Sequence, residues 1–600
     1  AAKATYGRKG DKIVQMNYDA IDAGAKQVVE IEVPESWKSC EDEGLFTPEV
    51  KGGKDDVVAF VKNIQSKVNA QEGNTLPVST FTDYADGSTP SGSAAYEKRG
   101  IAVDIPVWQS ENCIQCNRCA YVCPHAVIRP VALTEDELAK APEGTKAIDM
   151  IGMPGMKFTM TVSAYDCTGC GSCVNVCPGK KGEKALVMAN MEENAAEQDI
   201  FDFGREIEVK PEVVAKFKPE TVKGSQFKQP LLEFSGACAG CGETPYAKLI
   251  TQLFGDRMYI ANATGCSSIW GNSSPSTPYT MNSKGQGPAW SNSLFEDNAE
   301  FGYGMLLAQK AIRKRLKEEV ETVATSEQAS AEVKAACQEY LDTFACGITN
   351  GDATDKLVAA LDGCDCDTCK DIVKNKDFLA KKSQWIFGGD GWAYDIGFGG
   401  VDHVLASGQD INIMVFDTEV YSNTGGQSSK ATKTGATAQF AAGGKETKKK
   451  DLAGIAMSYG YVYVAQIAMG ADFNQTVKAI AEAEAYPGPS LIIAYAPCIN
   501  HGIKKGMSKA QTEEQLAVEC GYWNNFRFNP EAEKKFTLDS KEPKGDYQEF
   551  LNGEVRYNAL MRANPEKAQR LFAQNEAEAM ERYEYLKGLV NLYDGTAKED

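Results

Sequence analysis

Cysteines at a repeated spacing are the feature of this sequence most able to do chemistry. The chain has 19 cysteines, and two runs share the pattern C-x2-C-x2-C-x3-C-P. Three thiolates on one tight loop can hold three corners of an iron–sulfur cubane, and where two clusters are paired the fourth cysteine of a run ligates the other cluster. Zinc and disulfides explain the pattern less well, because zinc sites rarely use four cysteines in one short run. We therefore expect two [4Fe–4S] clusters, one on Cys113, Cys116, Cys119 and Cys177 and the other on Cys167, Cys170, Cys173 and Cys123.

A further C-x2-C pair, Cys238 and Cys241, needs two more thiolates to complete a site. Cys266 follows an apolar segment, and Cys498 lies at the carboxyl end of a predicted strand, where open α/β sheets place their ligands. From spacing alone, a third cluster on these four cysteines, a zinc site and free buried thiols all remain open.

Three more cysteines lie close together at Cys364, Cys366 and Cys369. Their spacing is metal-like, but the surrounding stretch is charged. A labile metal site and plain solvent-facing thiols are both compatible with this pattern.

Glycines and an aspartate follow another predicted strand. Gly388-Gly389-Asp390-Gly391-Trp392 comes directly after the apolar run 384–387, and Thr418 follows the run 411–416. Glycines let a backbone approach a diphosphate closely, and a following helix N-terminus helps to hold it. Asp390 and an oxygen ligand near Thr418 could share a Mg²⁺ ion, which bridges diphosphate oxygens. Together, the two strand ends predict a site for a diphosphate cofactor.

The first 205 residues are expected to form two domains. Residues 1–100 are predicted to be a small mixed α/β domain, with a strand at 27–33 and a helix at 55–67. Residues 101–205 carry the two cysteine runs, separated by a spacer long enough to contain an inserted element.

Residues 206–600 alternate short apolar runs with helical lengths, which is typical of a parallel sheet covered on both faces. A charged helical insertion is expected at about 307–380, and a helical tail at about 554–590. The predicted strands are the runs 384–387, 411–416, 461–464 and 490–495.

Composition excludes several classes of protein. The net charge is −20, which argues against nucleic acid as the main partner. No apolar run approaches the ~20 residues that a membrane helix needs. So many closely spaced thiols must stay reduced, which predicts a cytoplasmic location.

Several stretches resemble the pyruvate:ferredoxin (flavodoxin) oxidoreductase family. Gly-Asp-Gly followed after about thirty residues by a polar strand end is similar to the thiamine-diphosphate signature, with Asp417-Thr418 where a pair of Asn residues is usual. The resemblance covers essentially the whole chain, which looks like the carboxyl-terminal half of the single-polypeptide form. The longer likenesses lie at 389–397, 402–408, 417–428, 238–246 and 497–502.

The resemblance implies a parallel-sheet thiamine-diphosphate-binding domain beside a ferredoxin-like α+β domain with two clusters. It also implies a third [4Fe–4S] cluster, nearest thiamine, on Cys238, Cys241, Cys266 and Cys498. Mg²⁺ would be held by Asp390, Thr418 and the Val420 carbonyl, with Asn423 near the reacting centre. The cofactor-binding residues that the family implies are Gly389, Asp390, Gly391, Trp392, Thr418, Val420 and Asn423.

The implied activity is the oxidative decarboxylation of pyruvate, with coenzyme A, to acetyl-CoA and CO2. Electrons would pass singly through three clusters to ferredoxin or flavodoxin. Oxidation of another 2-keto acid, such as 2-oxoglutarate or indolepyruvate, remains an alternative. So does a non-catalytic iron–sulfur electron-transfer subunit.

One catalytic ingredient has no counterpart before residue 101. In the family, the carboxylate that contacts the aminopyrimidine ring and the main pyruvate contacts come from a separate domain. We therefore expect an N-terminal half or a partner chain, in a complete protein that is a homodimer.

Basic residues near the two cysteine runs are candidates for docking an acidic electron acceptor, although ordinary solvated side chains explain them nearly as well. His125 is predicted to be a surface or loop residue, and His403 and His501 are predicted to be structural. The docking candidates are Arg118, Arg129, Lys180, Lys181 and Lys184.

Overall fold

The computed structural model describes residues 2–39, 53–273 and 276–593. The chain divides into a unit Ala1–Glu49 and a unit Val50–Asp600. In the first unit, α1 (Ala2–Tyr6) and α2 (Asp11–Lys26) are helical. In the second, α3 (Asp55–Phe60) and α4 (Ser66–Asn69) flank a π-helical turn, which confirms the predicted helix at 55–67.

The strand predicted at 27–33 is wrong. Val28 and Ile31 are 78% and 76% exposed, and no strand pairs with this segment among the described residues. An apolar run without a pairing partner cannot satisfy its backbone as a strand. The described residues before Asp104 form helices and irregular structure only, so the α/β domain predicted for 1–100 is helical there.

The region of the two cysteine runs is α+β. Strand β1 (Asp104–Trp108) pairs antiparallel with β5 (Leu186–Asn190). Short helices α5 (Arg118–Tyr121) and α7 (Ser172–Val176) each follow the second cysteine of a run. The spacer between the runs forms a three-stranded antiparallel sheet, whose strands are β2 (Ile128–Leu133), β3 (Ile148–Asp149) and β4 (Lys157–Val162).

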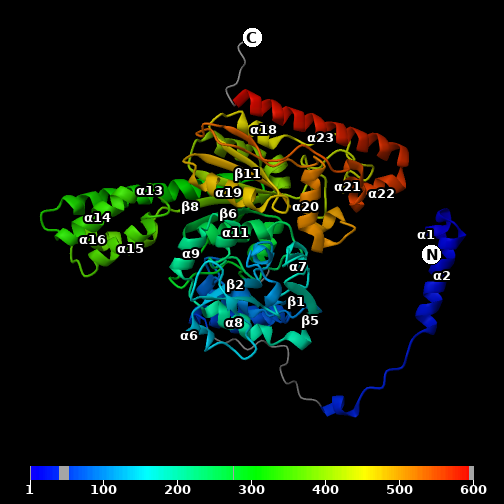
Figure 1. Cartoon of the computed structure of the whole chain (residues 1–600), viewed down its shortest axis with the longest axis horizontal. Coiled ribbons are helices and arrows are strands. Elements are labelled where there is room, and N and C mark those ends of the chain that lie inside the picture. The colour runs from blue at the N-terminus through cyan, green and yellow to red at the C-terminus, as the bar shows by residue number, and fades with distance from the viewer. Residues whose placement is uncertain (1, 40–52, 274–275, 594–600) are drawn as a thin grey trace, which may run out of the picture. The chain divides into compact units, whose positions relative to one another are not determined.

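An eight-stranded sheet forms the centre of the second unit, in the order β13-β12-β10-β11-β9-β8-β6-β7 (Figure 1). Six strands are parallel, and β12 (Phe526–Phe528) and β13 (Phe536–Leu538) extend one edge antiparallel. The parallel sheet predicted from the apolar runs is confirmed. Its parallel strands are β6 (Met258–Ala263), β7 (Ala289–Ser293), β8 (Ser383–Gly389), β9 (Ile411–Asp417), β10 (Tyr463–Ile467) and β11 (Pro489–Tyr495).

Two apolar cores cover the two faces of this sheet. Ile386 of β8 points into one core, and its neighbours Trp385 and Phe387 point into the other, as the alternation of side chains along a strand requires. Helices α13 (Asn298–Thr325) and α17 (Phe398–Ala406) contribute to the first core. Helices α11 (Thr244–Phe254) and α19 (Phe473–Ala485) contribute to the second. Burial on both faces explains why the strands read as continuous apolar runs.

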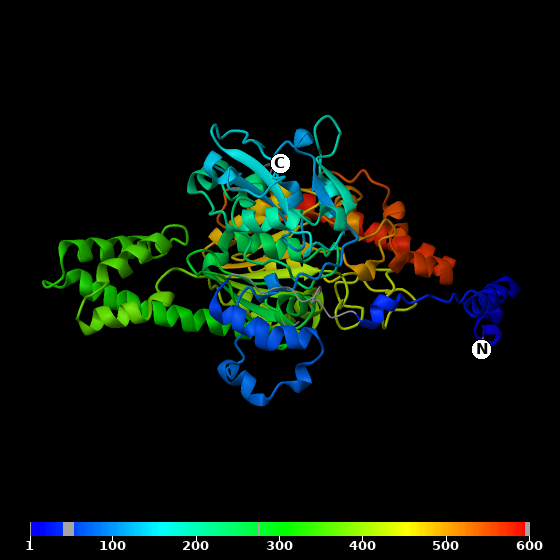
Figure 2. The ribbon, with the colours of Figure 1, turned by 90° about the horizontal axis from the view of Figure 1, so that it is seen from below.

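The charged stretch forms the predicted helical insertion, with an apolar core of its own. Figures 1 and 2 both show it reaching away from the sheet. It consists of α13 with α14 (Ala331–Thr343), α15 (Asn350–Leu361) and α16 (Asp367–Lys374).

The predicted helical tail is confirmed as α22 (Val555–Ala563) and α23 (Pro565–Tyr593). None of the helices in the described ranges has the length and apolarity needed to cross a membrane. The domain boundaries near residues 100 and 205 stay predictions.

Candidate active site

Four neighbouring strands bring the predicted site residues to one edge of the sheet. Strands β11, β9, β8 and β6 are parallel neighbours, so their carboxyl ends lie together. Asp390 follows β8, Thr418 follows β9, Cys498 follows β11 and Cys266 follows β6. Open α/β sheets bind ligands at this edge.

Three oxygen atoms converge at the centre of the edge. The Thr418 hydroxyl lies 3.0 Å from Asp390 Oδ1 and 3.0 Å from the Val420 carbonyl oxygen. The Thr418 backbone N–H donates to the same Asp390 oxygen at 3.2 Å. Asp390 is fully buried. Burial raises the pKa of its carboxyl group well above the usual value, and the nearby Asp417 carboxylate raises it further. A carboxylate, a hydroxyl and a carbonyl are hard oxygen donors of the kind that Mg²⁺ takes.

The Val420 carbonyl turns toward Thr418 because Glu419 adopts a left-handed backbone, with φ of 59°. This conformation is uncommon for a residue other than glycine. Lys449 Nζ and an Arg556 guanidinium nitrogen each lie 3.0 Å from the Glu419 carboxylate. Burial opposes the charge on Glu419, but Lys449, Arg556 and Lys433 more than offset it and hold its pKa far below the usual range. The ion pairs therefore hold the turn in place.

The glycines of the Gly-Asp-Gly motif are required by close packing. A Cβ on Gly391 would lie 2.5 Å from the Tyr421 ring, and a Cβ on Gly388 would clash with the Trp392 ring. Trp392 is fully buried in a π-helical turn over Gly391–Ile396. Gly389 ends β8 beside these residues. Asn423 lies exposed on the loop after Val420.

The third cysteine set meets at the same edge. The Gly242 backbone N–H donates to the Pro497 carbonyl at 3.2 Å, which joins the Cys238–Cys241 loop to the segment carrying Cys498. Burial raises the pKa of Cys498 to about 12, and Glu243, Cys238 and Asp390 add to the effect. Burial, Glu243, Cys241 and Cys498 likewise raise the pKa of Cys266. The four thiols predicted as a set are therefore close neighbours.

This third set also contacts the oxygen site, which consists of the Asp390 carboxylate, the Thr418 hydroxyl and the Val420 carbonyl. Cys266 Sγ lies 3.1 Å from the Ser422 hydroxyl, on the loop that follows Val420. Asn500, two residues past Cys498, donates to the Ser422 carbonyl at 3.2 Å. The thiols and the three oxygens therefore belong to one continuous site.

The fourth cysteine of each run lies beside the other run, which is the arrangement that the predicted exchange of ligands requires. One hollow in the α+β region is lined by Cys113, Cys116, Cys119 and Cys177. Burial raises the pKa of Cys119, and the neighbouring thiols of Cys116, Cys113 and Cys177 raise it further. Burial also raises the pKa of Cys173, and smaller increases come from its neighbours Cys170, Cys123, Cys119 and Cys167.

The two loops have the same backbone. Left-handed residues stand at Gln115 and Asn117 in the first run and at Gly169 and Gly171 in the second. In each loop the first cysteine sulfur accepts a backbone N–H at 3.4 Å, from Gln115 or Gly169. The Gln115 side chain is tied down through Asp149 and Ile151, each at 2.8 Å. Backbone donors to the sulfurs favour the anionic thiolates that a cluster needs.

Known families match three parts of the chain. Residues 105–181 match the family described as a 4Fe-4S dicluster domain, and residues 376–494 match the thiamine pyrophosphate enzyme, C-terminal TPP binding domain. Residues 48–102 match a domain of unknown function.

Whole proteins match along nearly the entire chain. It is 54% identical over 599 residues to the pyruvate-flavodoxin oxidoreductase of Enterobacter agglomerans, covering 98% of this chain and 50% of that protein. It is 55% identical over 602 residues to the pyruvate:ferredoxin oxidoreductase of Moorella thermoacetica, with the same coverage. The chain is therefore similar, along nearly its whole length, to pyruvate:ferredoxin and pyruvate-flavodoxin oxidoreductases. It spans about half the length of these relatives.

A solved structure, 2-oxoglutarate:ferredoxin oxidoreductase from Magnetococcus marinus, is a more distant likeness. It is 16% identical, with a TM-score of 0.25, over 44% of this chain and 65% of that one.

The structure adds site residues that the family resemblance did not predict. The Ser429 hydroxyl donates to Asp390 Oδ2 at 2.6 Å. Glu243 is buried next to the third cysteine set, where it accepts the Trp270 indole N–H at 2.7 Å, and burial raises its pKa to about 7. Glu243 could have been noticed directly after Cys241-Gly242. By contrast, no local pattern distinguishes Ser429.

The three histidines lie in different surroundings. His125 lies in a turn, so its prediction as a loop residue is confirmed. It is only 2% exposed, with Nδ1 3.1 Å from the Ser235 carbonyl, so the surface alternative is wrong. Burial lowers its pKa to about 4. His501 is fully buried, 2.7 Å from the Thr418 carbonyl, and His403 packs edge-on against Tyr303. Both contacts are compatible with the structural roles predicted for them.

Among the docking candidates, Arg129 is excluded because its side chain is 11% exposed and ion-paired with buried Glu233. Lys184 is exposed but donates to backbone carbonyls of the loop ending at Cys177. Arg118, Lys180 and Lys181 are exposed.

Proposed function

We propose that this chain is the thiamine-diphosphate-binding and electron-transferring part of an enzyme that oxidises pyruvate. The reaction is pyruvate plus coenzyme A to acetyl-CoA, CO2, a proton and two electrons, which pass singly to ferredoxin or flavodoxin. The names of the relatives at 54% and 55% identity support this substrate and acceptor.

One observation carries the proposal, namely the contact between Cys266 and Ser422. It joins a four-thiol set to the loop that supplies the oxygen site. An oxidative enzyme needs an electron acceptor beside its reacting centre. A cluster held by Cys238, Cys241, Cys266 and Cys498 would stand in that position.

Mg²⁺ and the diphosphate would be held by Asp390, the Thr418 hydroxyl and the Val420 carbonyl. The fit is supported by the hydrogen bonds of 3.0 Å that already join these oxygens. Gly389, Gly391 and Trp392 would frame the diphosphate, and Asn423 would lie near the reacting centre. When bound, thiamine diphosphate supplies the carbon nucleophile and the electron sink that cleavage beside a keto group requires.

Three [4Fe–4S] clusters would be held by twelve cysteines. The predicted exchange between the two runs is supported by the hollow that Cys113, Cys116, Cys119 and Cys177 share. Backbone N–H groups of Glu243 and Asn500 point at Cys241 and Cys498, at 3.4 and 3.5 Å. Such donors stabilise thiolate sulfur and the extra charge of a reduced cluster.

The remaining parts of the enzyme would come from elsewhere in the complete protein. We assign the aminopyrimidine-side carboxylate, the main pyruvate contacts and the coenzyme A contacts to the other half or to a partner chain. The complete protein would be a cytoplasmic homodimer.

Assay of the complete protein tests this function. Viologen reduction is measured with pyruvate, 2-oxoglutarate and indolepyruvate, with and without coenzyme A. Fastest turnover with pyruvate, dependent on coenzyme A, is expected. A higher kcat/KM with another 2-keto acid would overturn the substrate. Absence of bound thiamine diphosphate and of turnover with every acid would favour a non-catalytic electron-transfer subunit.

A further inference from the structure

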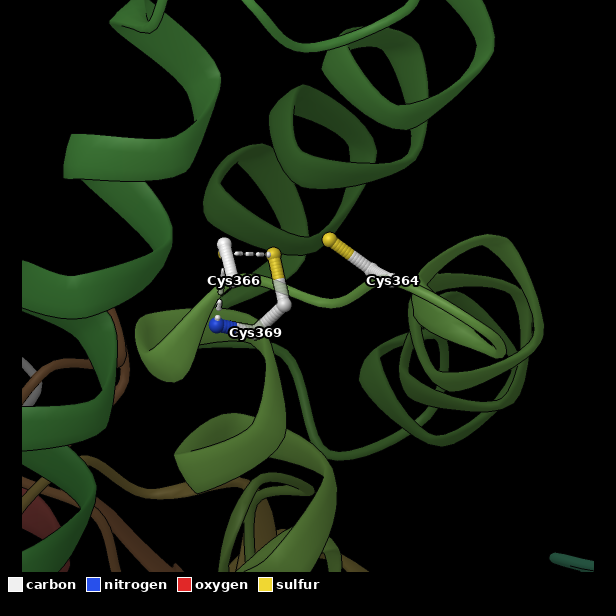
Figure 3. A group of neighbouring side chains, drawn as sticks. All are labelled: Cys364, Cys366 and Cys369. Atoms are coloured by element: carbon white, nitrogen blue, oxygen red, sulfur yellow. Dashed lines mark hydrogen bonds between the residues drawn. The ribbon is translucent and has the colours of Figure 1, made fainter.

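Three thiols converge in the helical insertion, which the proposed reaction does not use. Figure 3 shows the side chains of Cys364, Cys366 and Cys369 directed toward one another at the turn between α15 and α16. Their sulfur atoms all lie within 4.8 Å of one another. In the described parts of the chain, no other group of three or more Cys, His, Asp or Glu ligand atoms is drawn together this closely.

The turn holds the three thiols in place. Cys366 is the N-cap of α16, and its sulfur accepts the Cys369 backbone N–H at 3.1 Å. Cys369 is 3% exposed and packs with Ile372 and Leu361 in the core of the insertion. Cys366 is exposed and Cys364 partly so. A ligand at this point would therefore rest on a rigid base and face solvent.

We propose that Cys364, Cys366 and Cys369 bind one thiolate-preferring d¹⁰ cation, Zn²⁺ or Cu⁺. On tetrahedral Zn²⁺ the fourth coordination position would be open to solvent. Thiolates are the ligands that these ions prefer. The compactness of the group favours a single ion, since the twelve cysteines proposed for clusters form no group this tight. The site would tie the end of α15 to the start of α16.

Geometry and charge are compatible with this assignment. Sulfurs on one tetrahedral zinc stand about 3.8 Å apart, because each Zn–S bond is about 2.3 Å. The sulfurs of Cys366 and Cys369 are 2.6 Å apart, so this pair must open by about 1 Å, which the exposed Cys366 side chain allows. Asp365 and Asp367 add negative charge in the same turn.

A Cys366–Cys369 disulfide is the competing state for these atoms. It would use two thiols and leave Cys364 beside them without a function. Convergence of all three sulfurs therefore favours the metal.

The test measures metal in the full chain with its iron–sulfur clusters in place. The protein is incubated anaerobically with Zn²⁺ or with buffered Cu⁺, desalted, and analysed by inductively coupled plasma mass spectrometry. We expect about one equivalent of added metal per chain. Cys364→Ser and Cys366→Ser should lose at least nine-tenths of it, while iron content stays unchanged.

The matched control is Cys346→Ser, an exposed cysteine of the same insertion outside the group. It should retain the full equivalent. Cys366→Ser changes an exposed side chain, so folding is preserved, and unchanged circular dichroism verifies this. Equal metal in wild type and Cys366→Ser would overturn the proposal. A Cys366–Cys369 disulfide in anaerobically alkylated protein, with no added metal bound, would overturn it as well.

Discussion

The two cysteine runs, 113–123 and 167–177, form two ferredoxin-type sets of thiols. They are assembled differently from the third set, which consists of Cys238, Cys241, Cys266 and Cys498. Each ferredoxin-type loop brings three thiols together within seven residues, through the same pair of left-handed positions. The third set gathers thiols that follow β6 and β11 with a pair that precedes α11. Local backbone geometry makes the first kind, whereas the order of strands in a sheet makes the second.

This difference predicts which structural changes each set of cysteines should tolerate. Loops that close over a few residues need little help from distant parts of the chain. A set made at strand ends depends on the packing that fixes those ends. Damage to the sheet edge should therefore remove the third set and the oxygen site while sparing the ferredoxin-type pair.

Asp390→Ala should have the largest effect. Loss of the buried anionic ligand leaves Mg²⁺ and the diphosphate without compensation, so bound thiamine diphosphate should disappear and turnover of the complete enzyme should fall on the order of 10³-fold. Iron content should not change. Asp410→Ala is the control, because Asp410 precedes the opposite end of β9. Full cofactor occupancy in Asp390→Ala would contradict the assignment.

Cys498→Ala should remove one cluster of three. The intact chain should carry about twelve iron atoms, and the variant about eight. The two ferredoxin-type signals should persist in electron paramagnetic resonance spectra. Cys177→Ala should instead alter a ferredoxin-type signal and leave the third cluster in place. Parallel loss of all signals in Cys498→Ala would mean that the sets are not independent.

Lys180→Glu with Lys181→Glu should slow reduction of ferredoxin several-fold at low salt, while leaving viologen reduction unchanged. Charge attraction over an exposed patch is screened beyond about 8 Å at physiological salt, so the effect should shrink as salt rises. Lys184 is left intact because it supports the Cys177 loop. The control reverses exposed Lys314 and Lys374 of the insertion. Unchanged ferredoxin turnover at low salt would move the docking surface elsewhere.

Tyr246→Phe should weaken the third set selectively. The Tyr246 hydroxyl accepts the Met469 backbone N–H at 2.8 Å and lies 3.0 Å from the Tyr495 carbonyl, so it ties α11 to the ends of β10 and β11. Its loss should cost about 1–3 kcal/mol of unfolding free energy. Iron should be lost first from the third cluster, as measured by chelation kinetics. Equal loss from all clusters would argue against selective support.

Glu514→Gln should change how stability depends on pH. Burial raises the pKa of Glu514 to about 8 in the folded state, whereas an unfolded Glu titrates near 4.5. The folded chain therefore holds this proton between the two values, and wild-type stability falls as pH rises through that window. The fall should be smaller in Glu514→Gln, by up to a few kcal/mol between pH 5 and pH 9. Urea midpoints at the two pH values measure it; parallel curves would contradict the shifted pKa.

Sequence reasoning succeeded where a pattern maps directly onto local geometry. The placement of Cys123 and Cys177, each beside the other run, follows from spacing. Strands β8 and β9 follow from apolar runs. It failed where tertiary context decides. The run 27–33 has apolar residues but pairs with no strand in the described parts of the chain. His125 is buried by segments distant in sequence.

The charged groups around the oxygen site likewise could not be predicted from the sequence. Lys449 and Arg556 lie far from Glu419 along the chain, and no motif links them. Their role is visible only once folding has placed them 3.0 Å from its carboxylate.

The left-handed turn at Glu419 has a consequence for cofactor capture. Because ion pairs fix residues 418–420 during folding, a diphosphate ligand meets a turn whose shape is already set. Fixing the backbone of one residue costs about 1–2 kcal/mol of conformational entropy. If the loop were flexible, this cost would reduce the binding free energy of the cofactor once for each residue that becomes ordered on binding. The rigid turn should therefore let the chain fill its site at lower cofactor concentration and release the cofactor slowly.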